Sequence, residues 1–161
     1  ITRRSMVQIH PPLPLLLSNL SASKLRKITE HTADAGIEVE AASLPEAFNE
    51  VSLAFTEIVT GGNLPQSKRS HVIELESTEL DSLLVKFVSD LIFLFDTEDF
   101  LVSSAKVEIK VEPLFVLKGT LFGDTYNQSE HGYGVEIKAV SYHLLEVISG
   151  PPSKIKVILD L

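Results

Sequence analysis

The spacing of hydrophobic residues changes along this chain, and that change constrains the fold more than any other feature. Residues 44–60 and about 79–95 carry apolar side chains at helical spacing. After Asp96, apolar and polar residues mostly alternate, which is typical of strands. Helices grouped early and strands grouped late predict a single α+β domain, in which two helices cover a largely antiparallel sheet.

Capping residues indicate where both helices begin and where the first one ends. Ser43 followed by Glu46 has the pattern of a capping box, in which each side chain bonds the other's backbone amide. Gly61-Gly62 supplies the left-handed residues that end helices. Thr78, with Asp81 three residues later, is the predicted cap of the second helix.

Shorter alternating stretches complete the predicted secondary structure. Residues 25–41 form either two strands or one kinked strand, and further strands are predicted at 71–76, 106–112, 114–122, 135–148 and 155–159. Residues 1–24 are rich in Pro and Ser and have no sustained period, so we expect a flexible N-terminal extension. The predicted domain spans residues 25–161.

Composition excludes several classes of site and partner. The chain has no cysteine, which excludes disulfides and thiolate metal sites. Its formal net charge of −8 repels phosphate backbones, so we expect no direct binding of nucleic acid. Acidic residues are concentrated in 74–99, where Lys86 is the only basic residue. This stretch is either a solvated face or a surface for a basic protein partner.

Apolar runs and prolines indicate where the protein resides. No apolar run reaches the roughly 18 residues that a membrane-spanning helix needs, so we expect no membrane partner. Arg3 and Arg4 before Leu13–Leu17 imitate a signal peptide, but prolines interrupt the apolar region. We therefore expect a cytoplasmic protein. Pro113 and Pro151-Pro152 indicate protected sheet edges and favour a monomer.

Common catalytic motifs are missing from the sequence. It contains no Gly-x-x-x-x-Gly-Lys-Ser/Thr, no His-Glu-x-x-His and no Gly-x-Ser-x-Gly, and we expect no catalytic residue. His31, His131 and His143 share no short ligand spacing, so each is expected to be a hydrogen-bonded structural histidine or a support to a metal ligand. His31 is retained as such a support because it lies three residues before Asp34.

Two aspartates at opposite ends of the patterned region are the candidate site residues. Asp34 has the same parity along its strand as Glu38 and Glu40, and Asp160 lies opposite the apolar side of 155–159. Taken singly, Asp34 has the alternative role of a turn residue, and Asp160 that of a solvated residue near a terminus. Both carboxylates leave the apolar face, so neighbouring strands would bring them together.

A divalent cation is the expected ligand if the first and last strands are neighbours. The carboxylates of Asp34 and Asp160 and the α-carboxylate of Leu161 would then crowd at one sheet end, where like charges raise a pKa or recruit a cation. Oxygen ligands of this kind hold Ca²⁺, Mg²⁺ or Mn²⁺. We expect such an ion, with Ca²⁺ as the first choice.

Several short motifs, taken in their order, resemble the archease family. The resemblance runs from Leu25 to the last residue. The motifs are His31-Thr32-Ala33-Asp34-Ala35-Gly36, Ser43-Leu44-Pro45-Glu46-Ala47-Phe48, Gly123-Asp124-Thr125-Tyr126, His131-Gly132, Glu136-Ile137-Lys138-Ala139-Val140-Ser141-Tyr142-His143, Leu145-Glu146-Val147 and Ile158-Leu159-Asp160-Leu161. The first 24 residues precede the usual family start, and Ser149–Ser153 replaces a tighter or aromatic-containing turn.

The resemblance implies a small α+β protein that is a cofactor of a tRNA-splicing ligase. That ligase joins RNA ends bearing a 2′,3′-cyclic phosphate or 3′-phosphate to a 5′-hydroxyl, through a histidine guanylylated with GTP and Mn²⁺. The archease promotes guanylylation and multiple turnover and is not itself the ligase. The family's divalent cation would be held here by Asp34, Asp160 and Leu161.

Two other functions remain open from the residues alone. A generic chaperone or protein-interaction module with a structural metal fits the same acidic composition. A metal-dependent phosphoesterase would need a general base and an open metal position, which the sequence does not specify.

Overall fold

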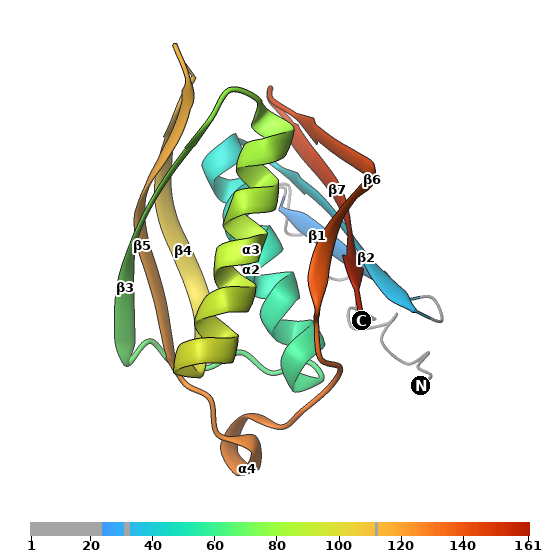
Figure 1. The fold of residues 1–161 in the computed structure, drawn as a ribbon, viewed down its shortest axis with the longest axis vertical. Coiled ribbons are helices and arrows are strands. Elements are labelled where there is room, and N and C mark those ends of the chain that lie inside the picture. The colour runs from blue at the N-terminus through green and yellow to red at the C-terminus, as the bar shows by residue number, and fades with distance from the viewer. Residues whose placement is uncertain (1–23, 31–32, 112) are drawn as a thin grey trace.

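The computed structural model describes residues 24–30, 33–111 and 113–161. Two antiparallel sheets enclose two long helices, so the chain forms three layers (Figure 1). All of the predicted N-terminal extension except Lys24 lies outside the described residues. None of the helices in the described part of the chain is long and apolar enough to cross a membrane.

The chain begins in one sheet with β1 and β2, forms the other sheet with β3, β4 and β5, and returns to the first with β6 and β7. One sheet has four strands in the order β1-β2-β7-β6, and the other has three in the order β3-β5-β4. The bounds are β1 Leu25–Glu30, β2 Asp34–Ala41, α2 Leu44–Thr60, β3 Arg69–Ser77, α3 Leu80–Glu98, β4 Phe100–Lys110, β5 Phe115–Thr125, α4 Gln128–His131, β6 Ala139–Ile148 and β7 Ser153–Asp160.

The α+β class and the antiparallel pairing are confirmed, but the strands divide into two sheets. The reason lies in α2, whose buried side chains surround most of the helix and do not form a single stripe. Phe48 and Phe55 are buried, and so are the polar side chains of Ser52 and Thr56. A helix buried on opposite faces needs a covering layer on each side.

Glycine and hydroxyl caps mark the ends of α2, and the Ser43 half of the predicted capping box is present. Ser43 Oγ accepts a hydrogen bond from the Glu46 amide at 3.4 Å. Gly61 ends the helix at φ 85°, and a Cβ there would come within 2.8 Å of the Tyr133 carbonyl oxygen. The glycine is therefore required both by its backbone conformation and by the close approach of the chain.

The predicted Thr78 cap of the second helix is wrong by one residue. The capping position is Glu79, whose carbonyl oxygen accepts the first helical bond from the Leu83 amide at 3.0 Å. No side chain caps this end, and Asp81 instead lies in the first turn, where a negative charge favours the helix dipole. The helix also continues past Phe95 to Glu98.

Two strands begin at other residues than predicted, because apolar and polar side chains do not alternate regularly there. Strand β4 begins at Phe100 because Phe100, Leu101 and Val102 are all buried beside a bulge between Val102 and Ser104. Strand β6 begins only at Ala139. The Val135 amide before it donates to the carbonyl oxygen of Ile58 in α2, at 3.0 Å, so this segment ties the sheet to the helix.

A largely buried ion-pair group joins β1 to α2. Arg26 Nε and Nη2 donate to the two carboxylate oxygens of Glu57, each at 3.0 Å, and Arg26 Nη1 donates to Glu50. Glu50 and Glu57 are only 4% and 6% exposed. Burial lowers the pKa of Arg26, but the hydrogen bonds and charges of Glu57 and Glu50 outweigh it and raise that pKa. The arginine therefore stays charged and compensates the buried carboxylates.

We expect Arg26→Met to lower the free energy of unfolding by about 3 kcal/mol, because it leaves the buried Glu50 carboxylate without its cation. Urea denaturation at neutral pH measures the loss. Lys27→Met is the matched control, since Lys27 is the exposed neighbour on the other side of β1. A loss for Arg26→Met no larger than that for Lys27→Met would contradict the stabilising role.

Candidate metal site

The predicted aspartates lie directly opposite each other at one end of the four-stranded sheet. Asp34 is the first residue of β2 and Asp160 the last of β7, and the two are register partners in the antiparallel pair. The alternate residues Ala35 and Leu159 face the core and are fully buried. Cβ atoms of directly opposed residues are about 5 Å apart, so both carboxylates lie within reach of one ion on the outer face.

Leu161 is held beside this pair by the backbone. Its amide donates to the Ala33 carbonyl oxygen at 3.0 Å, which continues the pairing one step beyond β7. The Lys138 amide donates to the Asp160 carbonyl oxygen at 2.8 Å from the other side. The three predicted ligand residues are therefore brought together. The predicted supporting residue His31 lies outside the described residues.

One carboxylate oxygen of the pair lacks a partner. Asp34 Oδ1 is buried and makes no hydrogen bond to the described residues. Within the same part of the chain, no lysine or arginine forms an ion pair with Asp34 or Asp160. A buried unpaired oxygen costs free energy, and a bound cation would remove that cost. The donor set therefore fits a hard divalent ion.

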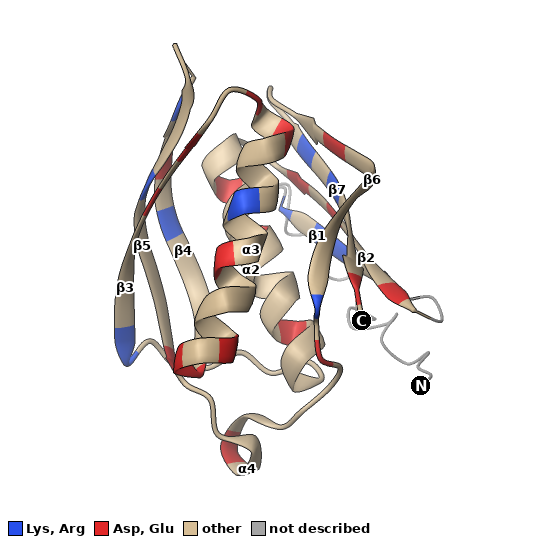
Figure 2. Cartoon of the chain, in the orientation of Figure 1, with Lys and Arg blue, Asp and Glu red and all other residues tan. Residues whose placement is uncertain are grey.

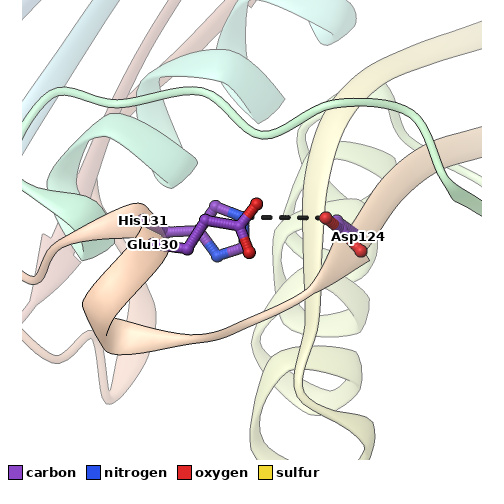
Figure 3. A group of neighbouring side chains, drawn as sticks. All are labelled: Asp124, Glu130 and His131. Carbon is purple, nitrogen blue, oxygen red and sulfur yellow. Dashed lines mark ion pairs between the residues drawn. The ribbon is translucent and has the colours of Figure 1, made fainter.

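A second acidic group, not predicted as a site, lies near α4. Asp124, Glu130 and His131 have ligand atoms within 4.8 Å of one another, close enough to hold a metal ion (Figure 3). His131 Nε2 is 3.7 Å from Asp124 Oδ2 and 4.0 Å from Glu130 Oε2. Lys68 Nζ approaches the same two oxygens at 3.8 and 4.0 Å. The ammonium group of Lys68 therefore already balances part of the negative charge of these carboxylates.

The protonation of His131 also argues against a metal at this second group. The Asn127 amide donates to His131 Nδ1 at 3.0 Å, so Nδ1 is the acceptor and the neutral ring carries its proton on Nε2. A metal at Nε2 would have to displace that proton and leave the ring with no hydrogen on either nitrogen. His131 is buried and stacks on Tyr126, which fits the structural role expected from the sequence.

Sequence reasoning found Asp34 and Asp160 but not the Asp124 group. The aspartates were detectable because strand parity is a local property. Asp124 and Lys68 come together only because β3 pairs with β5, and Lys68 donates its amide to the Gly123 carbonyl oxygen at 2.7 Å. His143, the third histidine considered, lies in β6 and is exposed.

Comparison with known proteins gives matches over most of this chain. The model of the archease protein family matches residues 27–161. The archease of Pyrobaculum neutrophilum is 36% identical over 121 residues, which is 73% of this chain and 82% of that protein. The archease of Methanothermobacter thermautotrophicus is 34% identical over 132 residues, covering 81% of this chain and 94% of that protein.

A solved structure shows the same fold. The solution structure of Protein 1598 of Methanobacterium thermoautotrophicum has a TM-score of 0.71 and 33% sequence identity, over 83% of this chain and 96% of that one. The match covers most of both chains. Together with the sequence matches, it shows that this chain belongs to the archease family.

Proposed function

We propose that this chain is a protein activator of a tRNA-splicing RNA ligase. The ligase would join a 3′-phosphate or 2′,3′-cyclic phosphate to a 5′-hydroxyl, and this protein would promote guanylylation of the ligase histidine and multiple turnover. Family membership supports the proposal. The observation that carries it is the opposed Asp34–Asp160 pair with its unpartnered buried oxygen.

The ion of this site would be a divalent metal, with Ca²⁺ first and Mg²⁺ or Mn²⁺ as alternatives. The ligands would be Asp34, Asp160 and a main-chain oxygen of Leu161. Bound at this sheet end, a divalent ion supplies positive charge that favours phosphoryl groups. The residues of the chain hold the site in place: β2 and β7 fix the two carboxylates, and the Ala33 and Lys138 backbone bonds hold the end of β7.

The charge distribution supports docking on a basic protein in preference to RNA. Acidic positions are spread over the view: they occur at the start of β2, at the end of β7, on α4, on β6 and at both ends of α3 (Figure 2). The formal net charge is −8. A basic ligase surface would be attracted to such a chain, whereas a bare phosphate backbone would be repelled. We accordingly propose a cytoplasmic, monomeric and non-catalytic protein.

We expect Asp160→Asn and Asp34→Asn to lose the stabilisation that the divalent ion gives. Adding Ca²⁺ or Mn²⁺ at 100 times the dissociation constant stabilises a folded protein by about 2.7 kcal/mol, and thermal denaturation with and without the ion measures that gain. Without the ion, each variant should be at least as stable as the unmodified protein, because removing one of two opposed like charges relieves their repulsion.

Glu40→Gln is the control for this experiment, since Glu40 lies on the same face of β2 at the other end of the strand. It should keep the full ion-dependent shift. An equal shift in Asp34→Asn and in the unmodified protein would refute the site. A shift lost instead in Asp124→Asn would assign the ion to the group near α4.

We expect the unmodified protein to increase guanylylation and repeated turnover by a purified tRNA-splicing ligase supplied with GTP and Mn²⁺. Asp160→Asn should lose most of this stimulation while keeping its fold, and Glu40→Gln should retain it. Ligase-bound guanylate and ligated product are measured separately, which distinguishes guanylylation from turnover. Recovery of many unrelated proteins in a pull-down, with no effect on the ligase, would instead favour the general interaction module.

A further inference from the structure

Strand β6 carries a large bulge next to the candidate metal site. Ser141 pairs with Ile158 and Glu146 pairs with Lys156. Residues 142–145 therefore face Val157 alone, so the chain leaves the sheet at this point. The bulge interrupts the regular pairing of an edge strand and turns side chains outward.

Leu144, in this bulge, adopts a conformation that leucine rarely takes. Its φ is 57°, in the left-handed region, and its side chain is 70% exposed. The left-handed region is unfavourable for residues with a Cβ, and an exposed apolar side chain gains little from burial within the chain. Such strain is concentrated at sites that contact other molecules.

A pocket of about 520 Å³ lies beneath the bulge, on the outer face of the four-stranded sheet. Its floor includes Thr29, Gly36 and Ile158, and Leu144 forms part of its wall. A Cβ at Gly36 would come within 2.5 Å of Thr29 Oγ1. A larger residue at position 36 would therefore clash with Thr29 at the floor of the pocket. The pocket has apolar surface on the wall and floor and charged groups around them.

This pocket is continuous with the candidate metal site. Gly36 and Ile158 are register partners, and they lie two residues from Asp34 and Asp160 on the same face. Two residues along a strand span about 6.6 Å. A molecule seated in the pocket would therefore lie beside the two aspartates.

The charges around the pocket favour a basic occupant. Glu38 and Glu146 line it, with Lys156 between them in the register. Counting the neighbouring Asp34, Asp160, Lys27 and Lys138 gives four carboxylates against three ammonium groups, so the surroundings stay net negative. An arginine side chain fits both properties of the pocket, because its stem packs on apolar walls while its guanidinium binds carboxylates.

We propose that this pocket is a docking site for an arginine-bearing segment of the partner ligase, which rests on the proposed function. The arginine stem packs against Leu144 and Ile158, and its guanidinium pairs with Glu38 or Glu146. The side chain of Leu144 is then buried only in the complex, and this burial offsets the cost of its left-handed backbone. Docking here brings the Asp34–Asp160 pair against the ligase surface.

Leu144→Gly and Leu144→Asn test the pocket without harming the fold, since both residues tolerate the left-handed conformation. We expect their thermal midpoints to be unchanged or raised and their ion-dependent shifts to be normal. Affinity for the purified ligase, measured by calorimetry, should fall about tenfold, the size expected for losing a buried anchor. Val72→Thr is the matched control, because Val72 is 77% exposed on the opposite sheet.

Glu146→Lys should weaken ligase binding more than Leu144→Gly does, because it places a positive charge against the incoming arginine. Glu76→Lys, at an exposed position of β3, is the charge-matched control. A photo-crosslinking residue at position 144 identifies the segment contacted. A crosslink to an arginine-bearing ligase segment supports the proposal, and one to a second copy of this chain or to RNA overturns it.

The experiment separates this inference from the proposed function. Full ligase affinity in Leu144→Gly and Glu146→Lys, with stimulation lost in Asp160→Asn, would overturn the pocket and leave the activator role intact. Absence of ligase binding in the unmodified protein and in both controls would overturn the two proposals together.

Discussion

The pairing of β2 with β7 is the constraint on which the rest of the structure depends. It joins residues near opposite ends of the described chain, and its register is held by core-facing partners such as Ile37 with Val157 and Val39 with Ile155. A slip of one residue would turn these side chains to solvent and move the aspartates to the core. The hydrophobic core therefore sets the geometry of the candidate site, because one alternation places apolar side chains inward and carboxylates outward.

The two acidic groups of this protein differ in what balances their charge. Asp124 and Glu130 have Lys68 and the Nε2 proton of His131 beside them. The Asp34–Asp160 pair has no cationic partner among the described residues, and one of its oxygens is buried without a hydrogen bond. Proximity of ligand atoms alone would select the first group. Charge balance and the protonation of the ring nitrogens are the reasons for proposing the Asp34–Asp160 pair as the cation site instead.

Local patterns predicted most of the elements and both aspartates, whereas features that depend on distant pairing were not predictable. Helix α2 and its caps follow from spacing and from Ser43 and Gly61 within a short segment. The division into two sheets, the Lys68–Asp124 contact and the β6 bulge each depend on strands far apart in sequence. Leu144 illustrates the limit, because a leucine in a strand-like sequence gives no sign that its backbone is left-handed.

The position of β7 in its sheet has a consequence for how the protein folds. This strand is the last in chain order, yet it lies inside its sheet, between β2 and β6. During synthesis β1 and β2 emerge before β7, so one edge of β2 stays unpaired until β7 has left the ribosome. Such non-local pairing slows folding. The candidate site and its sheet are thus completed only when β7 inserts, so a variant that lacks β7 has neither.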